Sequence, residues 1–188
     1  MRVAWTLEEI GVPYELVGVS AEEVKQPEHL ARHPLGRVPV LERDGAQVYE
    51  STGLCIDLAD RYPDARLIDR LGSPGRALVY QWAFFAMTEL EPPLLEILRH
   101  RESDPDRAAA GAASFREGAA VIEQALAGRD WLVGDSLTVA DVVTGGVLAL
   151  ANYVGQTAEH AHISAYLERL MSRPTFRRAA TATESPFA

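Results

Sequence analysis

The sequence predicts an α/β region over residues 1–65, followed by an all-helical region over residues 73–188. Apolar residues change their spacing repeatedly before residue 62, whereas every later apolar stretch follows a helical period. The dipeptide Asp44-Gly45 stands between two β-rich runs and tolerates the positive φ angles of a two-residue hairpin turn. These observations place strands in the first region and only helices in the second.

The first region opens on a helix, whose apolar residues repeat at helical spacing up to Ile10 and which Gly11 can end. Residues 14–19 are rich in β-forming side chains and predict a short strand. A short helix fits between Pro27 and Pro34, before the hairpin.

After the hairpin, the apolar spacing from Ser51 onward predicts another helix, and Cys55 lies on its apolar face. Cys55 is the only cysteine, so an intramolecular disulfide and a cysteine-based zinc site are excluded. We interpret it as a small buried hydrophobe rather than a reactive thiol. Residues 66–72 form the predicted linker.

The helical region contains three recognisable helix starts. Ser73 and Asp104 can each cap a helix that has proline at its first position. Thr138 and Asp141 resemble a capping box, in which each residue's side chain accepts a hydrogen bond from the other's backbone. The prolines at 92 and 93 should bend or interrupt the helix that starts after Ser73.

Composition excludes several classes of protein. The chain has 188 residues, is 47% apolar and carries a net charge of −9 with no basic stripe, so it is globular and unsuited to nucleic acid. No apolar run approaches a membrane span and no export signal is present, so we expect a cytoplasmic protein without a membrane partner. All but one of the 18 cationic residues are arginines, which favours bacterial origin.

No metal site is predicted. His29 and His33 could share a helical face, but Leu30 stands where the metalloprotease motif has glutamate, and Pro34 follows at once. Phosphate-binding glycine motifs and the nucleophile elbow of hydrolases are missing from the sequence as well.

Two features point to a site for a short anionic peptide. A cis bond at Val38-Pro39 would turn the Val38 backbone outward, where it could pair with an extended ligand. Glu50-Ser51 joins the second hairpin strand to the next helix, and Ser51 is a good N-cap. The same helix start also offers free N–H groups to a carboxylate.

Five segments of the chain form a recognisable series: VAWTLEEIGVPYELV, HPLGRVPVLERDG, YESTGLCIDLADRYP, WLVGDSLTVAD and SRPTFRRA. In their order and spacing they resemble the glutathione transferase family, and the resemblance covers nearly the whole chain. The resemblance implies a thioredoxin-like N-terminal domain, an all-α C-terminal domain, a homodimer and glutathione as co-substrate. It assigns Val38, beside Pro39, to the cysteinyl part of glutathione. Glu50 and Ser51 would hold the γ-glutamyl part, and Arg37 is the cation nearest in sequence for the glycyl carboxylate.

The chain departs from the family pattern at its start. In the family a first β-strand precedes the first helix, and the tyrosine, serine or cysteine that stabilises the glutathione thiolate follows that strand. Here the sequence opens on the helix, so the thioredoxin-like domain is predicted without its first strand and the catalytic residue is unknown. We expect Met1 to be an internal methionine of a longer natural protein.

The resemblance predicts an enzyme that adds the glutathione thiolate to a small electrophile, which would lie near Trp82, Phe85 and Met87. A noncatalytic binding module of the same fold, and a glutathione-dependent reductase or isomerase, are the alternatives. The missing thiolate-stabilising residue favours the module, whereas retention of the binding residues favours the enzyme.

Overall fold

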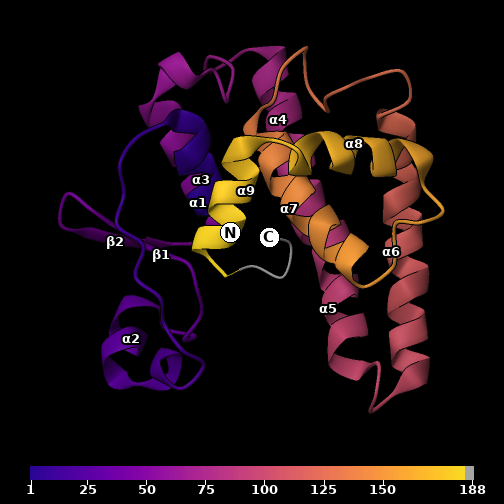
Figure 1. Cartoon of the computed structure of the whole chain (residues 1–188), viewed down its shortest axis with the longest axis horizontal. Helices are drawn as coiled ribbons and strands as arrows, with labels where there is room; N and C mark the ends of the chain where they lie inside the picture. Colours follow the sequence, from indigo (N-terminus) through magenta and orange to yellow (C-terminus); the bar gives the residue numbers. More distant parts are fainter. Residues whose placement is uncertain (185–188) are drawn as a thin grey trace.

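The computed structural model describes residues 1–184, so the last four residues of the predicted helical region lie outside it. Figure 1 shows the hairpin and a short helix on one side and a bundle of longer helices on the other. The first helix and the last helix lie between these two parts. The architecture is the one predicted, an α/β region followed by helices.

The N-terminal elements are α1 (Arg2–Ile10), a 3₁₀ turn (Glu23–Lys25), α2 (Pro27–Arg32), β1 (Val40–Arg43), β2 (Ala46–Tyr49), α3 (Ser51–Arg61) and a second 3₁₀ turn (Pro63–Ala65). Gly11 ends α1 in the left-handed conformation, as predicted. The hairpin is antiparallel, and Val40 pairs with Tyr49 at its open end. Both turn residues take positive φ angles, 53° at Asp44 and 78° at Gly45, which confirms the turn prediction.

The strand predicted at residues 14–19 does not form, and this prediction was wrong. Among the described residues the sheet has two strands, β1 and β2, and neither pairs with this segment. A β-rich sequence becomes a strand only when a neighbouring backbone accepts its hydrogen bonds. Leu16 and Val17 are instead 45% and 68% exposed.

The C-terminal elements are α4 (Pro74–Phe85), a π-helical turn (Ala86–Leu90), α5 (Glu91–His100), α6 (Pro105–Ala125), α7 (Val139–Tyr153), α8 (Ala161–Met171) and α9 (Pro174–Ala182). Ser73 caps α4 and Asp104 caps α6, each by accepting a backbone N–H three residues ahead. The predicted capping box of Thr138 and Asp141 begins α7. Prolines 92 and 93 lie in the first turn of α5, just after the π turn. Because proline donates no backbone N–H, the helical ladder is interrupted there without a break in the chain's path.

Helix α7 is the centre of the core. Almost all of its residues are buried, and it packs against α1, α3, α4 and α8. Trp5 of α1 is fully buried and meets Phe176 of α9 edge to face, with ring centroids 4.9 Å apart. The N-terminal part therefore shares a core with the helices. Between residues 1 and 184 no helix combines the length and the apolarity needed to cross a bilayer.

Candidate functional site

The hairpin register brings the predicted binding residues to one place. Val40 opens β1 and pairs with Tyr49, which closes β2. The residue before β1, Pro39, and the residue after β2, Glu50, therefore lie at the same end of the hairpin. The two features that were predicted separately from the sequence form one candidate site.

On one side of this site lies the segment that leads into β1. The peptide bond between Val38 and Pro39 is cis, which the sequence left as a possibility, and Val38 is 63% exposed. His29 of α2 holds this segment, because its Nε2 lies 2.9 Å from the carbonyl oxygen of Arg37. The Arg37 side chain is exposed.

His29 of α2 and His33, the residue that follows α2, have structural partners. Whereas His29 bonds to the backbone of Arg37, the ring of His33 packs on Tyr49 at a centroid distance of 4.5 Å. Over the part of the chain that the structure describes, no group of three His, Cys, Asp or Glu side chains could hold a metal ion.

On the other side lies the start of α3, where one prediction needs correction. Ser51 is the first residue of α3, and Glu50 takes the N-cap position that we predicted for Ser51. Glu50 has φ 78° and ψ 98°, a region that non-glycine residues seldom occupy and that costs about 1–3 kcal/mol. The Ser51 hydroxyl caps no backbone N–H and bonds to another side chain. The first N–H groups of α3 still have no intrahelical partners and lie at the positive end of the helix dipole.

The partner of Ser51 is Arg2, a residue that sequence reasoning missed. Its Nη1 donates to Ser51 Oγ at 2.9 Å, and its Nη2 forms an ion pair with Glu91 of α5. Burial lowers the pKa of the Arg2 guanidinium from its ordinary value. These partners are 49 and 89 positions away in the chain, so no local pattern could have indicated them.

The residues predicted to lie near the electrophilic substrate are on α4 and in the π turn. Trp82 and Phe85 are half-buried and contact each other edge to face, with centroids 5.8 Å apart. Met87, in the π turn, lies against Arg2, with its sulfur 3.3 Å from Nη1. Arg2 thus contacts both the π turn and the start of α3.

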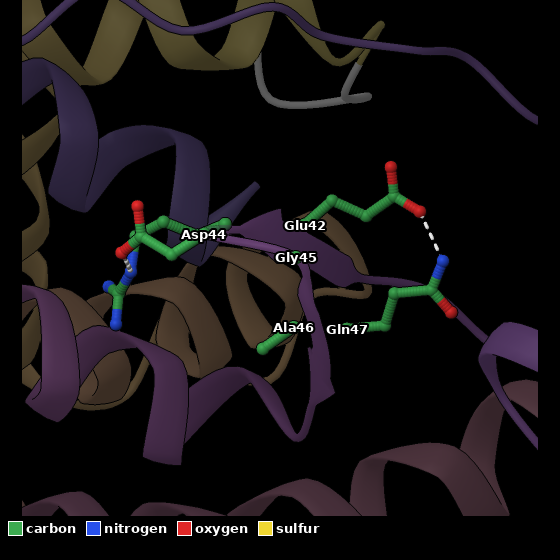
Figure 2. A pocket seen from close by; sticks show the side chains of 6 residues that line it. Glu42, Asp44, Gly45, Ala46 and Gln47 are labelled. Carbon is green, nitrogen blue, oxygen red and sulfur yellow. Dashed lines mark hydrogen bonds and ion pairs between the residues drawn. The ribbon is translucent and has the colours of Figure 1, made fainter.

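Two surface hollows lie away from this site. The larger, of about 340 Å³, is formed by residues 42–47 around the hairpin turn. Figure 2 shows the polar side chains that line it, among them Gln47, which donates a hydrogen bond to Glu42. The smaller, of about 230 Å³, lies in the loop before α7. Neither hollow includes a predicted binding residue.

The structure joins an α/β region, which carries the candidate site, to an all-helical region. The family model described as the N-terminal domain of glutathione S-transferase matches residues 1–66, and the model of the C-terminal domain matches residues 83–174. Glutathione S-transferase 4 of Zea mays is 30% identical, with 95% of this chain and 86% of the maize protein covered. The chain belongs to the glutathione transferase family.

Two further comparisons agree with this assignment. Glutathione S-transferase hmp2 of the fungus Hypomyces subiculosus is 28% identical over 95% of this chain and 92% of its own length. A sphingomonad glutathione S-transferase solved with glutathione superposes with a TM-score of 0.88 and 28% identity, over 97% of this chain and 93% of that one. The maize and fungal relatives give no support to the bacterial origin predicted from the arginine content.

Proposed function

We propose that this chain binds glutathione at the open end of the hairpin and transfers its thiolate to a small electrophile. The observation that carries the proposal is the pairing of Val40 with Tyr49, which joins Val38-Pro39 and Glu50-Ser51 into one site. The membership of the glutathione transferase family supports the choice of ligand, and so does the relative solved with glutathione.

Each residue has a role suited to one part of the tripeptide. Val38 is an exposed residue, and its backbone pairs with the cysteinyl unit in the manner of an added strand. At the start of α3, the free N–H groups and the Ser51 hydroxyl bind the γ-glutamyl carboxylate, while the Glu50 carboxylate faces its amino group. Arg37 is exposed and offers a cation to the glycyl carboxylate, which matters in a protein of net charge −9.

The transfer step needs the sulfur as thiolate. A free thiol has a pKa of about 8.5, and lowering it by about 2 units takes about 2.7 kcal/mol of preferential interaction with the thiolate. One hydroxyl hydrogen bond to an ion is worth about 1.5–3 kcal/mol, whereas an exposed helix start contributes about 0.3–1 kcal/mol. A hydroxyl donor beside the cysteinyl sulfur would therefore supply this interaction by itself, whereas the helix start alone would not.

Replacement of Ser51 tests the site. In the Ser51→Ala variant the γ-glutamyl carboxylate loses a hydrogen bond to a charged group, so the Kd for glutathione should rise at least about 10-fold. The free energy of unfolding should fall by no more than about 1.5 kcal/mol, because the hydrogen bond that the folded protein loses is the one between the Ser51 hydroxyl and the Arg2 side chain. Isothermal titration calorimetry and urea unfolding measure the two effects.

The matched control is Ser103→Ala, which removes an exposed hydroxyl in the turn after α5. Equal affinity in the wild type and the Ser51→Ala variant would remove Ser51 from the site. Retention on glutathione-agarose with no turnover of an activated aryl halide would favour the noncatalytic module over the enzyme.

The remaining expectations stay predictions. These are the homodimer, the cytoplasmic location, and the domain boundaries of 1–65 and 73–188.

A further inference from the structure

The Arg2 guanidinium joins the start of α3 to the helical part of the chain. It donates to Ser51 Oγ, lies against the Met87 sulfur, and forms an ion pair with Glu91 at the first position of α5. The side chains of Arg2 and Glu91 are only 15% and 20% exposed, so water screens their attraction weakly. One conformation of Arg2 thus has partners on two sides.

The Arg2 side chain occupies space that is open because residue 146 of α7 is glycine. A Cβ atom at position 146 would stand 2.8 Å from Arg2 Cγ and 3.2 Å from its Nε. Contacts this close force a neighbour to move, so even alanine at this position would displace the Arg2 side chain. Arg2 is therefore fixed by the backbone of α7 as well as by its polar partners.

The hydrogen bond from Arg2 decides what the Ser51 hydroxyl can do. A hydroxyl has one O–H donor and two acceptor lone pairs, whereas a guanidinium has donors only. Arg2 therefore occupies a lone pair of Ser51 Oγ, and the Ser51 O–H is left to donate to a different group. At the positive end of α3, the fitting acceptor is an anion.

We propose that Arg2 and Glu91 are positioning residues of the glutathione site. Glu91 holds Arg2, and Arg2 turns the Ser51 O–H toward the γ-glutamyl carboxylate of the ligand. The inference rests on the proposed function, because it takes glutathione as the ligand. It adds that the helical part of the chain, through α5, sets the affinity of a site whose predicted residues all lie between positions 37 and 51.

Removal of the Glu91 charge distinguishes two roles that Arg2 could have in glutathione binding. If Arg2 were only a counter-ion for the ligand, removal of the negative charge at Glu91 would strengthen glutathione binding. If Glu91 positions Arg2, the same removal weakens binding. The sign of the change in the Glu91→Ala variant therefore distinguishes positioning from charge attraction.

Calorimetric titration of the full chain with glutathione tests the proposal. We expect the Kd to rise about 5-fold in Arg2→Met and in Glu91→Ala, which is the effect of about one net hydrogen bond. Gly146→Ala should weaken binding as well, although it changes no charge. Because Arg2 acts through Ser51, adding Arg2→Met to a Ser51→Ala chain should cause no further loss.

The matched control is Arg101→Met, which removes an exposed arginine just after α5 and should leave the Kd unchanged. Thermal unfolding of each variant verifies that it is folded, and Glu91→Ala carries the test if Arg2→Met does not fold. Tighter binding by Glu91→Ala, or an Arg2→Met effect that is equal with and without Ser51, would overturn the inference alone. A wild-type chain that does not bind glutathione would overturn the proposed function together with the inference.

Discussion

Burial makes the thiol of Cys55 unreactive in the folded protein. Cys55 is 0% exposed within α3, and burial raises the pKa of its thiol to about 11. Because the thiolate is the reactive form, Ellman's reagent should release no colour from the native protein at pH 8. After unfolding in urea the same protein should react with one equivalent of reagent, and rapid reaction of the folded protein would contradict the buried position.

Residues were predictable where their neighbours in the chain define their role. Cys55 follows from the apolar spacing of one helix, and Asp44-Gly45 from the demands of a two-residue turn. Arg2 and Glu91 could not be found in this way, because they are 89 positions apart and only the fold brings their side chains together. Ser51 lies between these cases: its place at a helix start was predicted, but its partner was not.

At the scale of one element, α7 depends on a single carboxylate at its start. Asp141 is fully buried and accepts hydrogen bonds from the backbone of Leu132, from both the backbone and the hydroxyl of Thr138, and from the Tyr166 hydroxyl. The lengths of these four bonds are 2.8–2.9 Å. Loss of the carboxylate would leave buried donors of Leu132, Thr138 and Tyr166 without partners.

The Asp141→Ala variant should therefore be strongly destabilised. Each buried donor left without a partner costs about 1–3 kcal/mol, and a lost cap costs about 0.5–2 kcal/mol. We expect the free energy of unfolding to fall by at least about 3 kcal/mol, as measured by urea denaturation. Asp135→Ala, an exposed change in the loop before α7, is the control. A loss below about 1 kcal/mol would show that α7 does not rely on this capping box.

The elements also show where sequence patterns stop being informative. Helices with their own caps, such as α4, α6 and α7, were predicted because the starting signal is local. The hairpin was predicted for the same reason. Residues 14–19 have a comparable β-rich composition, but a strand needs a pairing partner, and composition does not say where that partner is.

At the scale of the whole molecule, the first and last helices hold each other in place. Glu9 of α1 accepts two hydrogen bonds of 2.7 Å from Arg173, just before α9, and further bonds from Trp5 and Thr175. The Glu9 side chain is only 6% exposed. Since α1 also packs on α3 and α7, this cluster connects the N-terminal part to the end of the helical part.

The Glu9 cluster should make stability depend on pH. Burial alone would raise the pKa of Glu9, but hydrogen bonds from Arg173, Thr175 and Trp5 outweigh it and the pKa lies below its ordinary value of 4.5. As the pH falls below about 4.5, the unfolded chain takes up this proton before the folded chain does, so the free energy of unfolding decreases. The stabilisation is complete above that pH and is lost as the pH passes through the folded pKa.

A Glu9→Gln variant should accordingly be less stable than the wild type at pH 7, and the difference should shrink as the pH approaches 3. Urea unfolding followed by tryptophan fluorescence, at intervals from pH 7 to pH 3, measures both curves. Glu96 and Glu123, whose pKa values are also lowered, are present in both chains, so the difference between the curves isolates Glu9. Glu22→Gln, an exposed change, should reproduce the wild-type curve. A constant difference between the Glu9→Gln and wild-type curves over the whole range would mean that the Glu9 carboxylate does not couple the two ends of the chain through its charge.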